Sequence, residues 1–170
     1  LEKIAKLNNN GMVILDHAHT PDALETCIKN IKDQFKFRKV NLVFGCGGER
    51  DKSKRKLMGK IANKYCNKIY LTDDNPRKEN PRIIRNQIKK GFKHRKFFEI
   101  SSRSKAISFA INKLNSGDVL IVAGKGHENY QEYKKKIFFS DKLEILKAIS
   151  IKNNHLSKYI KTNILKEELD

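Results

Sequence analysis

Four short segments of the chain combine glycine with charged or hydrogen-bonding side chains, and each directly follows an apolar run. They are residues 16–20, 45–50, 73–77 and 124–128. Within them, Arg50 and Arg77 could each hold a carboxylate through paired N–H···O bonds, and Glu128 could accept hydrogen bonds from an ammonium group. Together these side chains would complement a zwitterionic amino acid. Singly, each is by default a solvated surface charge.

The glycine-rich segments do not complete either standard phosphate-binding pattern. In residues 45–50, Arg50 replaces the third glycine of the G-x-G-x-x-G dinucleotide fingerprint. Gly124 and Lys125 lack the glycine that a P-loop needs five residues earlier, where Val119 stands, and no Ser or Thr follows them. Tight strand-to-helix turns with positive φ explain these glycines more simply. We therefore expect that this chain alone does not hold and activate a triphosphate.

Histidine and cysteine do not form a pattern that predicts a metal site. His17 and His19 alternate in an extended segment and could bind a metal together, but His19 fits a hydrogen-bonding loop histidine equally well. Cys27, Cys46 and Cys66 are widely spaced and contain no C-x-x-C pair, which argues against a disulfide framework or a structural zinc site. We expect buried, reduced thiols, a cytoplasmic location and no metal held by this domain.

The strong positive charge is weak evidence for a particular partner. The formal net charge is +18, which on its face suggests nucleic acid. The basic residues are spread along the chain in short runs such as 134–136, without an aromatic-flanked RNA-binding signature or zinc-finger spacing. We therefore do not expect nucleic acid as the partner, although the charge suits an anionic, nucleotide-linked substrate. No apolar run is long enough to predict a membrane span, and no signal-peptide pattern opens the chain.

The elements that position the four segments alternate between two kinds. Short apolar runs rich in β-branched residues predict strands, and segments with apolar residues at helical spacing predict helices. The expected strands cover residues 12–15, 40–44, 68–72, 97–100 and 119–123, with an edge strand at 137–139. The expected helices begin at Thr20-Pro21, Asn80-Pro81 and Ser101 or Ser102, and two further helices cover 57–65 and 143–149.

This alternation predicts the α/β class, with an open, mainly parallel, Rossmann-like sheet flanked by helices. The carboxyl ends of parallel strands meet at one edge of a sheet, so the four segments should converge there on a ligand site. We expect one domain over residues 1–150 and a polar tail of uncertain structure over residues 151–170.

The four segments, in this order, resemble the C-terminal domain of the Mur ligases over residues 1–149. Residues 16–24, 44–52 and 123–130 are similar to three conserved motifs of that family. Asp74 to Arg77 spells the DNPR motif of the branch that adds diaminopimelate, whereas lysine-adding relatives differ at the arginine. One departure is His17, which stands where the family usually has tyrosine.

The resemblance implies an enzyme of three domains, of which the N-terminal UDP-sugar domain and the central ATP-binding domain are absent from this chain. ATP and Mg²⁺, bound mainly by the central domain, would convert a carboxylate of UDP-N-acetylmuramoyl-L-alanyl-D-glutamate to an acyl phosphate. The amine of meso-diaminopimelate would then attack it to form an amide. This chain would contact the central domain and supply the amino-acid site, so the isolated domain should be inactive.

Matched position by position, the resemblance implies contacts with meso-diaminopimelate from Arg50, Asp74, Asn75, Pro76, Arg77, Gly124 and Glu128. Asp16 matches an acidic residue that contacts the nucleotide ribose, and His19 is a second candidate nucleotide contact. No catalytic residue is assigned within this domain.

Four other interpretations stay open. A Mur ligase that adds lysine, or a folylpolyglutamate synthetase-like domain, would share the fold. Arg77 favours diaminopimelate because it can pair with the extra carboxylate of that amino acid, whereas it would repel the terminal ammonium of lysine. A basic nucleic-acid-binding module and a non-catalytic remnant domain are the remaining alternatives.

Overall fold

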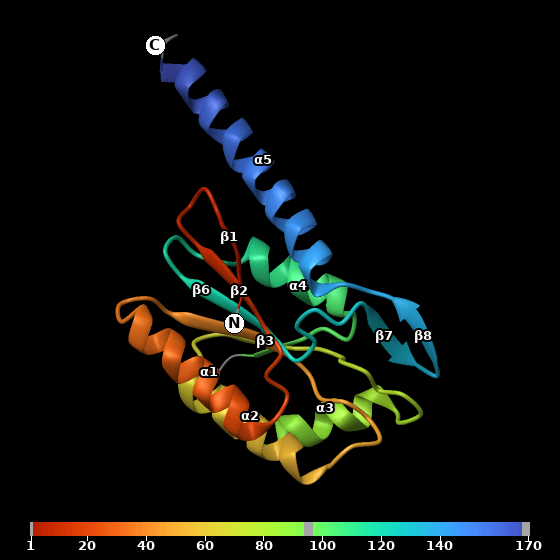
Figure 1. Ribbon diagram of the computed structural model, residues 1–170. Coiled ribbons are helices and arrows are strands. Elements are labelled where there is room, and N and C mark those ends of the chain that lie inside the picture. Colours follow the sequence, from red (N-terminus) through yellow and green to blue (C-terminus); the bar gives the residue numbers. More distant parts are fainter. Residues whose placement is uncertain (1, 94–96, 168–170) are drawn as a thin grey trace.

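The computed structural model describes residues 2–93 and 97–167, with side chains through residue 158, and shows a sheet between two layers of helices (Figure 1). Among these residues, the main sheet has the strand order β1-β2-β6-β3-β4-β5. β1 is antiparallel to β2, and the other neighbouring pairs are parallel. The strands are β1 (Glu2–Lys6), β2 (Met12–Asp16), β3 (Val40–Phe44), β4 (Ile69–Leu71), β5 (Phe97–Glu99) and β6 (Val119–Ala123). The predicted α/β class with a mainly parallel sheet is confirmed.

The helices begin where the local capping signals predict. Thr20 Oγ1 accepts a hydrogen bond from Ala23 N, Asn80 caps its helix in the same way, and Ser102 is the cap of the following helix. Proline occupies the first turn after Thr20 and after Asn80, where a missing N–H costs nothing. The helices are α1 (Pro21–Gln34), α2 (Ser53–Tyr65), α3 (Pro81–Lys89), α4 (Arg103–Asn112) and α5 (Asp141–Glu167).

Two hydrophobic clusters hold the layers to the sheet. α1, α2 and α3 pack on one face, with Leu24, Met58 and Ile88 buried against the strands. α4 and α5 pack on the other face, where Ile107 and Ile145 are fully buried. β3 and β6 lie between both layers and are apolar at almost every position, as expected for central strands of a parallel sheet.

Two strand assignments differ from the prediction. β1 was not expected, because its five residues include only Ile4 and Ala5 as apolar side chains and these are half-buried at the sheet edge. The strand expected at residues 137–139 lies at β8 (Lys135–Phe138), which pairs with β7 (Tyr130–Tyr133) in a separate two-stranded sheet. The hairpin therefore stands apart from the main sheet, beside the loop after β4.

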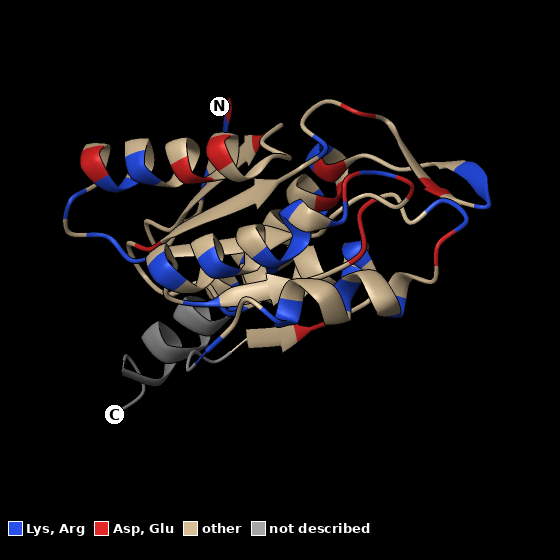
Figure 2. Cartoon of the chain, turned by 90° about the horizontal axis from the view of Figure 1, so that it is seen from below, with Lys and Arg blue, Asp and Glu red and all other residues tan. Residues whose placement is uncertain are grey.

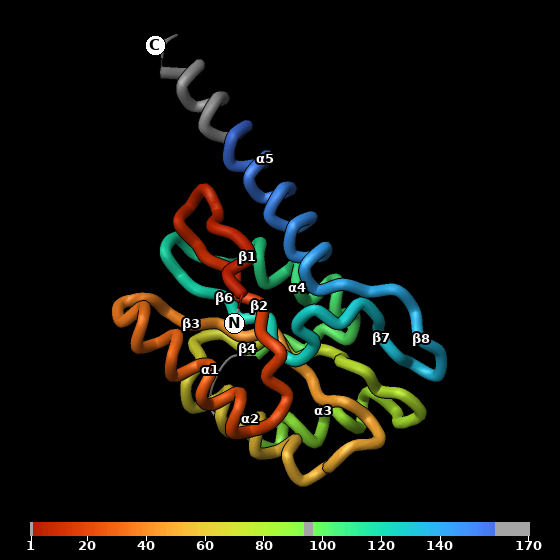
Figure 3. The backbone as a smooth tube through the Cα atoms, viewed as in Figure 1, coloured from red at the N-terminus to blue at the C-terminus, as the bar shows by residue number. Residues whose placement is uncertain are grey.

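The predicted end of the last helix at Ile149 is wrong, because α5 continues to Glu167. Lys152 explains part of the extension. Its ammonium donates to Ile111 O at 2.8 Å and Leu114 O at 2.7 Å, at the carboxyl end of α4, where a cation is favoured. Figure 3 shows α5 running from this contact past the rest of the domain. In the described part of the chain, no helix combines the length and apolar character needed to cross a membrane.

Candidate functional site

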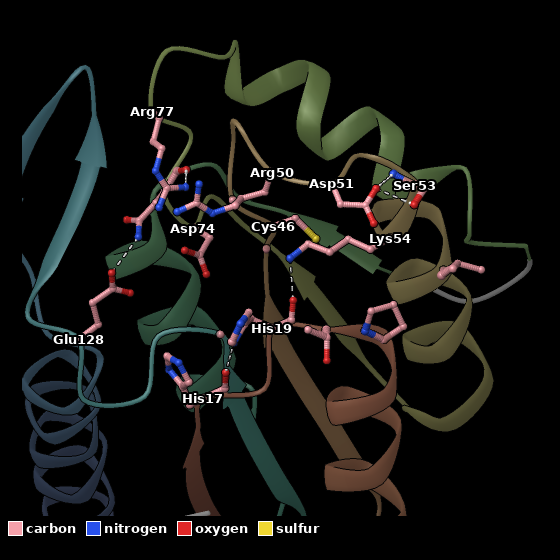
Figure 4. Close-up of a pocket in the computed structure, with 17 residues that line it drawn as sticks. His17, His19, Cys46, Arg50, Asp51, Ser53, Lys54, Asp74, Arg77 and Glu128 are labelled. Atoms are coloured by element: carbon pink, nitrogen blue, oxygen red, sulfur yellow. Dashed lines mark hydrogen bonds between the residues drawn. The ribbon is translucent and has the colours of Figure 1, made fainter.

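A pocket of about 530 Å³ opens where the segments after β2, β3, β4 and β6 meet (Figure 4). We call it the strand-end pocket. Its lining includes the predicted site residues His19, Arg50, Asp74, Asn75, Arg77, Gly124 and Glu128. Asp16 and Pro76 do not line it, although both adjoin residues that do. Parallel strand order thus brings together side chains that are far apart in the sequence.

Gly45 and Gly48 allow the loop after β3 to pack directly on the loop after β4. A Cβ atom on Gly45 would clash with the carbonyl oxygen of Thr72, and one on Gly48 would clash with that of Pro76. The expectation of positive φ is wrong at these two glycines, whereas Gly124 has a φ of +117° as expected. Close backbone packing is therefore the reason for glycine in the segment after β3.

Arg77 is held on two sides. Its backbone N–H donates to Glu132 O at 2.9 Å, and its Nε lies 3.3 Å from the Glu132 carboxylate in β7. Its Nη1 donates to Gly48 O at 2.9 Å. The residue has a φ of +55°, a conformation that costs a non-glycine residue roughly 1 to 2 kcal/mol and needs support from its surroundings. The hairpin of β7 and β8 provides that support, so Arg77 reaches the pocket in one orientation.

Asn75 and Glu128 are hydrogen-bonded to each other, and Asn75 also binds a buried lysine that the sequence alone did not reveal. Asn75 Nδ2 donates to Glu128 Oε1 at 3.1 Å, and Asn75 Oδ1 accepts from Lys125 Nζ at 2.6 Å and from Glu132 N at 2.9 Å. The side chain of Lys125 is fully buried, and its ammonium also donates to Tyr130 O at 3.0 Å. In the sequence, Lys125 stands out only through the incomplete P-loop pattern, because nothing nearby indicates burial.

The charges in this part of the pocket are shifted by burial and by their neighbours. Burial raises the pKa of Glu128, but the Tyr130 hydroxyl, the Lys125 ammonium and the Asn75 amide together hold the pKa below its usual value. Burial lowers the pKa of Lys125, and the carboxylates of Asp74 and Glu128 oppose that change. Glu128 is therefore ionised at neutral pH and can receive an ammonium group.

Arg50 lies at the exposed end of a loop whose base is anchored by another residue that we missed. Arg55 in α2 is fully buried, donates from Nη2 to Gly47 O at 2.9 Å and pairs with Glu79 at 2.9 Å. It lies in a basic stretch of α2, so the sequence suggests a solvated charge. The Arg50 side chain is exposed, donates to Glu49 O at 3.2 Å and extends toward the Asp74–Arg77 loop in Figure 4.

The histidines make hydrogen bonds within their own loop and to the loop after β6. His17 Nδ1 lies 3.1 Å from Lys125 O, and His19 Nδ1 lies 2.8 Å from His17 O. Asp16 Oδ1 accepts from Ala18 N at 2.8 Å. In residues 2–93 and 97–158, no three His, Cys, Asp or Glu side chains gather in a way that could hold a metal. Cys46 lines the pocket, but burial raises the pKa of its thiol to about 12, so it is not a reactive thiolate.

Charge outside the pocket is dispersed. Figure 2 shows Lys and Arg interspersed with Asp and Glu on the helices that face the viewer, and further basic residues at the tip of the β7–β8 hairpin. Among the described residues seen in this view, the basic side chains do not form the single stripe that nucleic-acid-binding domains usually have.

The fold and the pocket define a domain of one family. The chain belongs to the Mur ligase family, because residues 1–126 match the domain described as "Mur ligase, glutamate ligase domain". The family assignment made from the motifs is confirmed.

Two similar relatives carry the same name, UDP-N-acetylmuramoyl-L-alanyl-D-glutamate–2,6-diaminopimelate ligase. The protein from Rickettsia rickettsii is 47% identical over 145 residues, which are 84% of this chain and 30% of the relative. The protein from Wigglesworthia glossinidia brevipalpis is 50% identical over 149 residues, which are 86% of this chain and 30% of the relative. The chain therefore spans about 30% of the length of these relatives.

Solved structures agree with this placement. A structure of a UDP-N-acetylmuramoyl-L-alanyl-D-glutamate–2,6-diaminopimelate ligase matches with a TM-score of 0.78 and 40% identity, over 83% of this chain and 29% of that chain. A folylpolyglutamate synthase from Thermotoga maritima matches with a TM-score of 0.53 and 24% identity, over 72% of this chain and 26% of that chain. The second likeness shows a shared fold alone.

Proposed function

We propose that this chain is the amino-acid-binding domain of a cytoplasmic ligase that uses ATP to join meso-diaminopimelate to UDP-N-acetylmuramoyl-L-alanyl-D-glutamate in peptidoglycan synthesis. The observation that carries the proposal is a pocket that has Arg77 of the DNPR motif and the ionised Glu128 among its lining residues. Relatives with this name, at 47% and 50% identity, support it.

The proposed ligand contacts follow from charge. Arg77 and Arg50 pair with carboxylates of the amino acid, since a guanidinium can donate two parallel hydrogen bonds to a carboxylate. Glu128 and the carbonyl oxygen of Gly124 accept hydrogen bonds from the ammonium group at the far end. The second amine is left without a partner in this pocket. It is therefore free to lose its proton and act as the nucleophile.

The reaction needs a good leaving group on the acceptor carboxylate. Transfer of the γ-phosphoryl group of ATP to a carboxylate oxygen gives an acyl phosphate and ADP. Attack of the amine nitrogen on the acyl carbon then forms the amide bond and breaks the bond from carbon to the phosphate oxygen. This chain contributes by holding the amine in one position, which removes part of the entropic barrier.

ATP and Mg²⁺ are assigned to the rest of the protein. The glycine loop after β3 does not fit a phosphate cradle here, because the space beside Gly45 and Gly48 is filled by the carbonyl oxygens of Thr72 and Pro76. Asp16 and His19 stay as candidate contacts to the nucleotide. His19 lines the pocket, and Asp16 lies at the end of β2 beside it.

The test is an assay of the whole protein that contains this chain. We expect ATP-dependent amide formation with meso-diaminopimelate and an efficiency at least tenfold lower with lysine, with no turnover by residues 1–170 alone. Equal efficiency with lysine would contradict the assignment of meso-diaminopimelate as the substrate. Turnover by the purified 170-residue chain, in proportion to its concentration, would contradict the assignment of ATP to other domains.

A further inference from the structure

The buried ammonium of Lys125 is the centre of the deep side of the strand-end pocket. It donates to Asn75 Oδ1 at 2.6 Å and to Tyr130 O at 3.0 Å, and it lies 3.6 Å from Asp74 Oδ1 and 3.8 Å from Glu128 Oε2. Lys125 itself does not line the pocket, but Asp74, Asn75 and Glu128 all do. The lysine therefore supports side chains that a ligand would touch.

The first consequence concerns the Asn75 amide. Its Oδ1 atom receives two donors, the Lys125 ammonium and the backbone N–H of Glu132. If the amide were turned over, its NH₂ group would face those two donors and its oxygen would face the carboxylate of Glu128. Both contacts would be repulsive. Lys125 thus fixes the orientation in which Asn75 Nδ2 donates to Glu128 Oε1 at 3.1 Å.

The second consequence concerns charge. Asp74 and Glu128 are two carboxylates that share one lysine ammonium, which leaves one negative charge in excess. The next buried pair behind them, Arg103 with Asp141, is neutral as a unit. A ligand that brings one ammonium group to Glu128 would balance the deep side of the pocket.

Burying an ammonium group costs desolvation free energy, which charged and hydrogen-bonding partners must offset. Here its partners come from the loops after β4 and β6, which both form the pocket, and from Tyr130 at the start of β7. A lysine that only stabilised the fold would be expected to pair within the core, away from the ligand-lining side chains.

We propose that Lys125 is a positioning residue for the amino acid: it fixes the Asn75 amide and the Glu128 carboxylate so that the pocket accepts the ligand's ammonium group. The inference depends on the proposed function, because it assumes that the pocket holds an amino acid.

The test uses the whole protein and the variant Lys125→Met, which keeps the length of the side chain and removes the ammonium. We expect the KM for meso-diaminopimelate to rise at least tenfold, while the KM for ATP and for the UDP-linked dipeptide stays within twofold. Lys135→Met, on the exposed hairpin, is the matched control and should change none of these constants. A KM for diaminopimelate within twofold of wild type would overturn the proposal.

A double variant separates positioning from general damage. Asn75→Ala should raise the KM for diaminopimelate by at least tenfold in the wild-type background. In the Lys125→Met background it should raise that KM by less than threefold, because the amide is no longer oriented. Fully multiplicative effects would mean that Lys125 does not act through Asn75.

A second variant and a rule for a different substrate keep the test decisive. If Lys125→Met does not fold, Lys125→Gln retains a donor but no charge, and it should still raise the KM for diaminopimelate at least fivefold. An unchanged KM in that variant overturns the proposal. If wild type proves to use a different amino acid, the proposed substrate fails, and the role of Lys125 is judged on the KM for the amino acid that is used.

Discussion

The two sides of the strand-end pocket are built differently. On the deep side, Asn75, Arg77 and Lys125 are engaged by backbone and side-chain partners from β7 and the loop after β6. On the rim, Arg50 and His19 are exposed, and their side chains hydrogen-bond to carbonyl groups of their own loops. Groups that are already in place lose little entropy when a ligand binds, whereas solvated groups must first be ordered. The deep side should therefore set selectivity, and the rim should mainly add charge attraction.

The largest effect is expected beneath the deep side. Arg103 and Asp141 are both fully buried, lie 2.7 Å apart, and tie α4 to the start of α5 and to Ala123 O at the end of β6. Asp141→Asn should destabilise the chain by about 3 to 5 kcal/mol, because it leaves a buried guanidinium without its carboxylate. Urea unfolding of the chain measures this loss, with the exposed Asp33→Asn as control. The pair Arg103→Met and Asp141→Leu should lose less than the single variant. A single-variant loss under about 1 kcal/mol would mean that the pair does not anchor the deep side.

The next effect tests selectivity on the deep side itself. Arg77→Ala in the whole protein should lower kcat/KM for diaminopimelate by roughly 30-fold to several thousand-fold, or about 2 to 5 kcal/mol, because a carboxylate of the ligand would be desolvated and unpaired. Efficiency with lysine should stay the same or rise, because a charge that repels the lysine ammonium is removed, and the KM for ATP should hardly change. Lys78→Ala, the exposed basic neighbour, is the matched control. A decrease of less than about threefold would show that Arg77 is not the selector.

The stability of the fold should depend on pH through Glu79, whose partner Arg55 anchors the loop after β3 that carries Arg50. The hydrogen bonds from Arg55 hold the pKa of Glu79 at about 2, well below its usual value. A depressed carboxyl pKa stabilises the fold above the unfolded value near 4.5 and loses that contribution as pH falls toward 2. Unfolding free energies between pH 6 and pH 2 should therefore fall by roughly 2 kcal/mol more in wild type than in Glu79→Gln. A Glu79→Gln curve parallel to wild type would refute the assignment.

The smallest effect is expected at the rim. Arg50→Ala should lower kcat/KM for diaminopimelate by about 5- to 30-fold, or roughly 1 to 2 kcal/mol, since this guanidinium is solvated before the ligand binds. The difference from wild type should shrink as salt is raised from 50 to 500 mM, because exposed charges are screened. If Arg50→Ala cost more than Arg77→Ala, the contrast between rim and deep side would be wrong.

Much of the fold could be predicted because its signals are local. The caps Thr20, Asn80 and Ser102 each act within one helical turn, and the apolar periods of the helices and strands can be read within a dozen residues. β1 and β7 were not predicted, since short half-exposed strands lack a strong periodic signal, and β8 was predicted as an edge strand but not as part of a separate hairpin. The length of α5 was missed because the docking of Lys152 on the end of α4 is a contact across 41 residues.

The sequence by itself determined the family, the α/β class and the set of loops that meet at the strand ends. The order of the motifs and of the predicted strands can be read directly from the chain. Only the tertiary structure decided which charges in those loops are buried. Lys125 and Arg55 look like any other basic residue in a chain of net charge +18, and their roles depend on partners 50 and 24 residues away. Burial and pairing are properties of side chains brought together by the fold. They show that Lys125 and Arg55, which the local sequence does not distinguish from surface charges, are buried cations that support the pocket.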